Sequence, residues 1–119
     1  MIENKKNLIA ITNVENVGDD RKLYAELASN AKRLYAVLMA GKRDRVGYAV
    51  LYGDGDFVVH FHASGSSLGW SATVKPDASV RKISARMRGG RDTTASKRDA
   101  DSIKAMAIHL AQSAGVIPW

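Results

Sequence analysis

The sequence of 119 residues contains no cysteine, and its N-terminus contains no long apolar run. A chain without cysteine has neither disulfides nor thiolate metal ligands, which is common for proteins of a reducing compartment. The first fourteen residues hold two lysines and a short apolar stretch that Thr12 and Asn13 interrupt. This pattern is typical of neither a signal peptide nor a membrane span. We therefore expect a cytoplasmic protein that does not insert into a membrane.

The composition is that of one folded domain. Hydrophobic residues make up 45% of the chain and charged residues 25%, which are ordinary values for a globular protein. A chain of this length can bury one core and is too short for two. The sequence shows no internal repeat or low-complexity segment, so we expect a single domain over residues 1–119.

The net charge of +6 is concentrated in one segment. Residues 75–98 hold eight Lys and Arg residues and two Asp residues, so this segment alone carries the surplus of the whole chain. Such a cluster attracts polyanions, of which nucleic acid is the commonest, although surface charge also serves solubility.

The first part of the chain predicts a strand followed by a long helix. Residues 7–14 are rich in Ile and Val and bounded by Asn, which favours a strand. Asp19 or Asp20 can cap the start of the helix, and Gly41 can end it. Apolar residues recur between these signals at spacings of three and four, as on one face of a helix; they are Leu23, Leu27, Ala31, Leu34 and Leu38.

The middle of the chain changes to a period of two, which indicates strands. Residues 46–52 and 57–63 alternate in this way, and Gly53-Asp54-Gly55-Asp56 between them has the composition of a tight hairpin turn. Residues 69–75 alternate again. We expect these three strands to form an antiparallel meander.

Two helices are predicted after the meander. Over residues 78–88, Asp77 can act as the cap while Val80, Ile83 and Met87 share a face, and Gly89-Gly90 can end the helix. The alternative for this segment is a strand with Lys82, Ser84, Arg86 and Arg88 on one face.

The last helix begins at Ser96, which with Asp99 resembles a capping box, and Gly115 ends it. The predicted fold is thus α+β in the order β-α-β-β-β-α-α. It has an antiparallel sheet of three to four strands, a long helix before the meander and two C-terminal helices.

Two patterns in residues 60–70 suggest an active site. Gly65-Ser66-Ser67-Leu68-Gly69 fits G-x-S-x-G, but that motif requires a helix after the serine, and the predicted strand there favours a polar connection instead. His60 and His62 share one strand face with Cα atoms about 6.6 Å apart, so both rings could reach one metal. A third ligand at a diagnostic spacing is missing. We expect no metal or cofactor and favour a binding protein, while a metal- or histidine-dependent enzyme stays open as an alternative.

The basic segment is the stronger functional candidate. Lys97 and Arg98 occupy the first turn of the last helix, where the helix dipole disfavours cations, and a bound anion would relieve this conflict. We therefore predict a small nucleic-acid-binding domain that contacts the phosphate backbone, with His60 and His62 as an additional part of the binding face. The predicted contact residues are Arg81, Lys82, Arg86, Arg88, Arg91, Lys97 and Arg98.

The alternative is a protein-binding or inhibitory accessory module whose basic face covers an acidic partner. The choice between DNA and RNA stays open. Residues 57–63 could also pair with another chain at a sheet edge, so dimerisation stays open as well.

Overall fold

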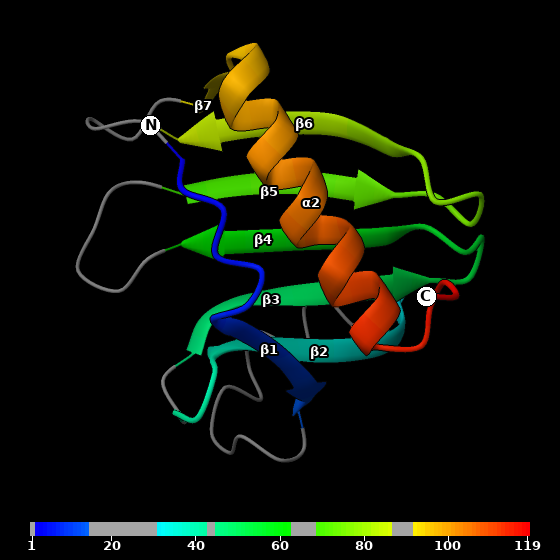
Figure 1. The fold of residues 1–119 in the computed structure, drawn as a ribbon. Coiled ribbons are helices and arrows are strands. Elements are labelled where there is room, and N and C mark those ends of the chain that lie inside the picture. Colours follow the sequence, from blue (N-terminus) through cyan, green and yellow to red (C-terminus); the bar gives the residue numbers. More distant parts are fainter. Residues whose placement is uncertain (1, 15–30, 43–44, 63–68, 87–91) are drawn as a thin grey trace.

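The computed structural model describes residues 2–14, 31–42, 45–62, 69–86 and 92–119, and it describes residues 92–94 by their backbone alone (Figure 1). The described residues form one antiparallel sheet whose strand order follows the chain. Six strands are followed by a short seventh strand and one helix. The elements are β1 (Ile9–Asn13), β2 (Ala31–Met39), β3 (Arg45–Tyr52), β4 (Phe57–His62), β5 (Gly69–Val74), β6 (Val80–Arg86), β7 (Asp92–Thr94) and α2 (Lys97–Ser113).

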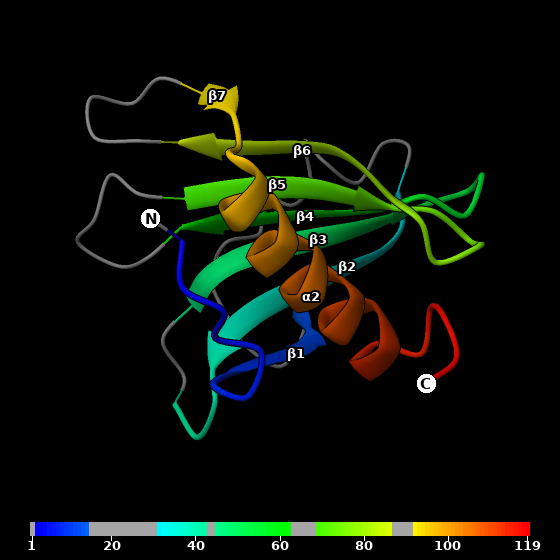
Figure 2. The same ribbon diagram turned by 45° about the horizontal axis from the view of Figure 1, so that its top comes forward.

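The core lies between the sheet and α2, which crosses one face of the sheet diagonally (Figures 1 and 2). The helix contributes a buried apolar stripe to this layer, made of Ile103, Met106, Ala107, Leu110 and Ala111. Every second residue of β4 and β5 belongs to the same hydrophobic core as this stripe. These are Phe57, Val59, Phe61, Trp70, Ala72 and Val74. Burial on one face of each strand is what the period of two predicts.

The strands of the meander are confirmed. β3 pairs with β4 and β4 with β5 in antiparallel register. The Gly53–Asp56 segment connects β3 to β4, where the Tyr52 N–H donates to the Asp56 carbonyl and the Gly55 N–H to the Tyr52 carbonyl. Gly55 has a φ of 95°, which is the conformation that favours glycine in such a turn.

The predicted helix up to Gly41 is wrong over residues 31–39, which form β2. Residues 19–30 of that prediction lie outside the described residues. Tyr35 and Val37 are buried in the core on the α2 side, whereas Ala36 is buried on the opposite side. Because the strand is apolar on both faces, Leu34 and Leu38 matched a helical spacing of four without belonging to a helix.

The predicted helix over residues 78–88 is also wrong, because residues 80–86 form β6. The alternative is confirmed in part: residues 80–86 form a strand with Ser84 and Arg86 on one face, but Lys82 interrupts the alternation and Arg88 lies outside the described residues. The register shifts between Ser71 and Thr73 of β5, opposite a bulge in β6 at Lys82, which has a φ of 54°. The bulge inserts one extra residue, so Val80 and Ile83 both face the core although they are three positions apart. This spacing imitated a helix face.

With these two corrections, the predicted order β-α-β-β-β-α-α is wrong. The described part of the chain has seven strands before a single helix.

The start of the last helix agrees with the prediction in part. The Ser96 hydroxyl accepts a hydrogen bond from the Asp99 N–H at 3.2 Å, as a helix cap does. The Asp99 carboxylate does not complete a capping box with Ser96. It is buried and accepts instead from the Ile2 N–H at 2.7 Å, which ties the N-terminal segment to α2.

Candidate functional site

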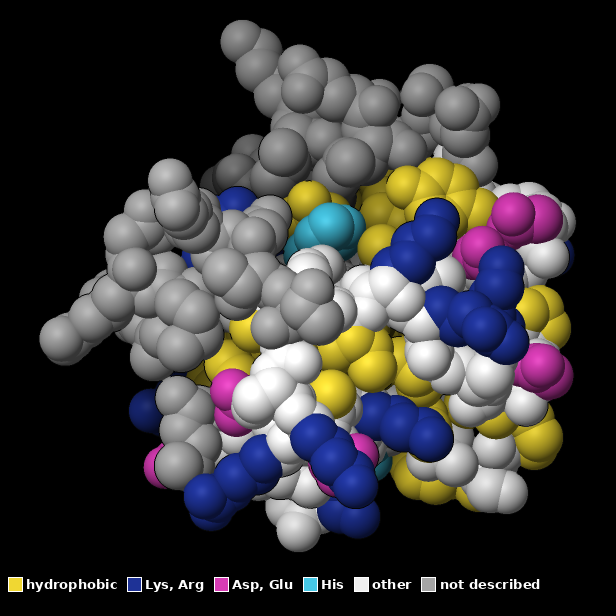
Figure 3. Space-filling view, turned by 90° about the horizontal axis from the view of Figure 1, so that it is seen from above, with side chains coloured by type: hydrophobic (Ala, Val, Ile, Leu, Met, Phe, Trp, Pro, Cys, Tyr) yellow, Lys and Arg dark blue, Asp and Glu magenta, His cyan; other side chains and the backbone are white. Residues whose placement is uncertain are grey.

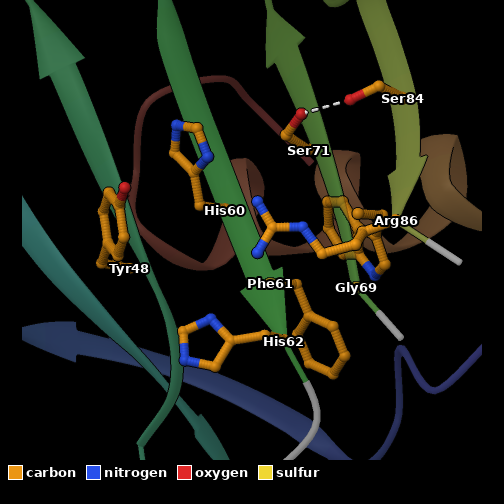
Figure 4. Close-up of a pocket in the computed structure, with 9 residues that line it drawn as sticks. Tyr48, His60, Phe61, His62, Gly69, Ser71, Ser84 and Arg86 are labelled. Carbon is orange, nitrogen blue, oxygen red and sulfur yellow. Dashed lines mark hydrogen bonds between the residues drawn. The ribbon is translucent and has the colours of Figure 1, made fainter. Parts of the chain in front are cut away.

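The sheet face opposite α2 carries a row of polar and aromatic side chains. Tyr48, His60, Ser71 and Ser84 occupy directly opposed positions on β3, β4, β5 and β6. Residues that are opposed in an antiparallel sheet point to the same side. Figure 4 shows this row from its own side, with α2 behind the sheet.

The row consists of two contacting pairs. The rings of Tyr48 and His60 are stacked, with centroids 4.8 Å apart and an interplanar angle of 24°. The hydroxyls of Ser71 and Ser84 are hydrogen-bonded at 2.7 Å. The pairing of β4 with β5 places the aromatic pair directly beside the hydroxyl pair.

A second row lies next to the first, toward the end of β4. It contains His62, Gly69 and Arg86 on β4, β5 and β6. A Cβ atom at Gly69 would stand 2.6 Å from the carbonyl oxygen of Phe61, so the close approach of the strands excludes a side chain at this position. The missing side chain at Gly69 leaves the space across which the Arg86 side chain extends from β6 toward β4 (Figure 4).

Small residues between large ones leave a cavity of about 430 Å³ on this face. Gly69, Ser71 and Ser84 lie at its floor, Tyr48 and His60 stand on one side, and the Arg86 side chain extends from β6 across the floor toward β4 (Figure 4). We call this cavity the sheet pocket. Its volume lies within the range of about 300–1,000 Å³ that is usual for small-molecule sites.

The electrostatic environment of the sheet pocket is positive. Partial burial and the charges of Arg45 and Arg86 lower the pKa of His62 below its ordinary value, burial being the largest cause. Both arginines disfavour a further positive charge at this position, and the same field favours a bound anion. The pocket thus combines an imidazole ring face, two hydroxyls and a guanidinium, which suit a planar ligand with a negative charge.

Five of the predicted contact residues form a basic edge next to the sheet pocket. Arg81, Lys82 and Arg86 are exposed along β6. Lys97 and Arg98 are exposed at the start of α2, which lies by the β6 and β7 side of the sheet (Figure 1). Figure 3 views the molecule from this side and shows Lys and Arg side chains across the described surface, with acidic side chains among them.

Lys75 of the segment is paired away from the basic edge. Lys75 bridges instead to Asp56 at 3.0 Å and thereby connects the ends of two hairpins. Arg88 and Arg91 lie outside the described residues, as does the Gly89-Gly90 pair that was expected to end a helix.

The start of α2 supplies its own negative charge. Asp99 lies in the same turn as Lys97 and Arg98, and its carboxylate is buried there. This carboxylate offsets part of the unfavourable interaction between the two cations and the helix dipole. The conflict that suggested a bound anion at the helix start is therefore smaller than the sequence indicated.

The structure describes the His60 and His62 pair but not most of the G-x-S-x-G match. His60 and His62 lie on the same face as Arg86, so they adjoin the basic segment rather than the core beneath α2. Within the described residues, no three His, Asp or Glu side chains are placed to hold a metal ion together. Residues 63–68, which contain most of the G-x-S-x-G match, lie outside the described part.

The comparisons with known proteins provide no family. No protein-family model matches the chain, and no curated protein or solved structure is significantly similar to it. No helix in the described ranges has the length and apolar character needed to cross a membrane. Any function must therefore be argued from the geometry of the site.

Sequence reasoning missed Tyr48, Ser71 and Ser84. Tyr48 and Ser71 lie in strands that the sequence predicts, and Ser84 lies in the segment for which a strand was the alternative. The sequence does not show which residues of neighbouring strands stand opposite each other. The row becomes visible only when β3, β4, β5 and β6 are aligned.

Proposed function

We propose that the protein is a cytoplasmic nucleic-acid-binding domain that contacts the sugar–phosphate backbone through its basic edge. The observation that carries this proposal is the presence of exposed cations from two separate elements at the β6 and β7 end of the sheet, with Arg81 and Arg86 on the face opposite α2 and Lys97 and Arg98 at the start of α2 (Figure 1). Arg81, Lys82 and Arg86 come from β6, and Lys97 and Arg98 come from α2.

The dimensions of the edge suit a phosphate backbone. Arg81 and Arg86 are five residues apart on a strand, which corresponds to roughly 17 Å, or somewhat less because of the bulge. One strand of a duplex carries a phosphate about every 3.4 Å of helix axis. The β6 cations can therefore face several consecutive phosphates, and Lys97 and Arg98 extend the contact toward α2.

The remaining residues of the proposal rest on the sequence. Arg88 and Arg91 continue the segment that starts with β6 and raise its charge further. Contacts between such side chains and phosphates position the nucleic acid without reading its sequence. We therefore expect affinity with little sequence preference from the basic edge alone.

The test is charge reversal with a matched control. The variant Arg81→Glu, Lys82→Glu, Lys97→Glu, Arg98→Glu changes the net charge by eight units. The control must change it equally at a distance from the edge, and four exposed cations meet this condition: Lys6, Lys32, Arg33 and Lys42. They lie near β1 and β2, at the other side of the sheet.

Fluorescence anisotropy with labelled single-stranded and duplex oligonucleotides measures the affinity of each protein. We expect the edge variant to lose binding and the control to retain most of it. Equal losses in both variants would contradict a localised edge, and no binding by the unmodified protein would reject the proposal. Equally tight binding of polyglutamate would favour the acidic protein partner instead.

A further inference from the structure

We propose that the sheet pocket binds one unpaired nucleotide, with the base against His60 above the Ser71–Ser84 pair and the phosphate at Arg86. Arg86 belongs to both the sheet pocket and the basic edge. The other residues of the pocket are not among the proposed backbone contacts. The inference rests on the proposed function only for the source of the nucleotide, which would be a strand held by the basic edge.

The aromatic pair provides the stacking surface. β3 and β5 flank β4 on opposite sides, and Tyr48 on β3 covers the face of His60 that is turned toward β3. The second face of the imidazole is therefore turned toward β5 and the sheet pocket (Figure 4). Unpaired bases stack on such rings in single-strand-binding proteins.

The hydroxyl pair provides the floor beneath the base. Serine at positions 71 and 84 leaves room beside His60 that larger side chains would fill. Each hydroxyl can donate or accept a hydrogen bond, so the pair can meet the edge of any base. We therefore expect the pocket to discriminate weakly between bases.

Arg86 provides the charge for the phosphate. It lies two residues beyond Ser84 on the same strand and on the same face, roughly 6.6 Å away at the Cα atom. Arg45 and Arg86 together make the surroundings of His62 positive. A phosphate at this end of the pocket would meet a guanidinium, which is the side chain best suited to bind it with two hydrogen bonds.

A preference for single strands follows from this arrangement. Bases in a duplex are paired and stacked on each other, so they cannot enter the pocket without leaving the helix. Loss of the ring at position 60 should weaken binding of a single strand about 5- to 150-fold, the range observed for stacking of one base. Binding of a duplex should change little.

The first experiment compares strands in His60 variants. His60→Ala should remove the preference for a single-stranded over a duplex oligonucleotide of the same sequence, and His60→Phe should restore it by keeping a ring. His109→Ala on α2 is the control and should leave the preference unchanged. If His60→Ala leaves the ratio of the two affinities unchanged, the pocket proposal is wrong while backbone binding stands.

The second experiment tests the pocket without an oligonucleotide. The chain has two tryptophans, of which Trp70 borders the pocket from the core side of the sheet and Trp119 is 81% exposed. A Trp119→Phe protein therefore reports on Trp70 fluorescence alone. Adenosine monophosphate should change this fluorescence saturably and inorganic phosphate much less, and the additional change Arg86→Gln should weaken the response to adenosine monophosphate.

The two proposals can fail separately. A response to adenosine monophosphate without oligonucleotide binding would reject the basic edge and identify a site for a free mononucleotide. Oligonucleotide binding without such a response, and without an effect of His60→Ala, would reject the pocket alone.

Discussion

Close backbone contacts require glycine at position 47 of the sheet, as they do at Gly69 in the sheet pocket. At Gly47, a Cβ atom would stand 2.1 Å from the backbone carbonyl oxygen of His60, and backbone atoms cannot move away as a flexible side chain can. We expect Gly47→Ala to lower the free energy of unfolding by about 1–3 kcal/mol, as overpacking does elsewhere. Urea denaturation measures this change. Gly53→Ala is the control, because no atom lies within 4 Å of its Cβ position; similar losses in both variants would contradict the close approach.

His62 should titrate below the ordinary histidine pKa of 6.5. The physical causes are partial burial and the positive charges of Arg45 and Arg86, which all penalise the imidazolium form. NMR titration of the imidazole signals measures the pKa, and His62→Gln assigns the signal. We expect Arg45→Gln and Arg86→Gln each to raise the pKa toward its ordinary value. A pKa that neither substitution moves would argue against the positive field in the sheet pocket.

The lowered pKa also has a consequence for stability. Between the folded and the ordinary pKa, the unfolded chain binds more protons than the folded one, so stability falls as the pH falls through this window. Above about pH 6.5, His62 is neutral in both the folded and the unfolded chain, so it no longer makes the free energy of unfolding depend on pH. Urea denaturation at several pH values should show a smaller loss in His62→Gln than in the unmodified protein.

At the scale of elements, the errors of sequence-based prediction have two identifiable causes. In β2 both faces are apolar, so the period of two disappears and Leu34 and Leu38 imitate a helix. In β6 a bulge shifts the phase of the alternation, so Val80 and Ile83 recur at a helical spacing. The strands with one polar face, β4 and β5, kept their alternation and were predicted correctly. Periodicity thus fails where a strand that is apolar on both faces matches a helical spacing, or where a bulge interrupts the pairing.

The bulge itself can be tested at Lys82. Its φ of 54° lies in the left-handed region, where a β-branched side chain is strongly disfavoured and glycine is not. We expect Lys82→Val to lower the free energy of unfolding by about 1–2 kcal/mol and Lys82→Gly to change it little. Chemical denaturation of the two variants measures both values. If valine were tolerated as well as glycine, Lys82 would not occupy this conformation.

At the scale of the whole molecule, the sequence identified the charge of the site but not its arrangement. The surplus of Lys and Arg in residues 75–98 is visible in the sequence, and so is the shared face of His60 and His62. That these two features meet at Arg86 depends on β6 being a strand next to β5, which the sequence interpretation did not favour. Which strands pair depends on contacts between residues that are distant in the sequence. These contacts cannot be predicted from the local patterns of a single sequence.

The number of cations that contact nucleic acid determines how strongly salt weakens binding. Each phosphate that a cation neutralises releases counterions, so the logarithm of affinity falls with the logarithm of salt concentration by about 0.7 per contact on single strands. Five contacts from the basic edge predict a slope of about −3.5, which is about a hundredfold loss of affinity between 50 and 200 mM salt. A slope near −5 would indicate that Arg88 and Arg91 also take part, because seven contacts are then counted.

Neutral substitutions then separate the edge from the rest of the surface. Lys97→Ala with Arg98→Ala should reduce the slope to about −2, whereas Lys6→Ala with Lys42→Ala should leave it unchanged, although both pairs remove two charges. Anisotropy titrations at four or more salt concentrations measure the slopes. If both pairs reduced the slope equally, binding would depend on net charge alone; if no slope were found, phosphate contacts would not be the source of affinity.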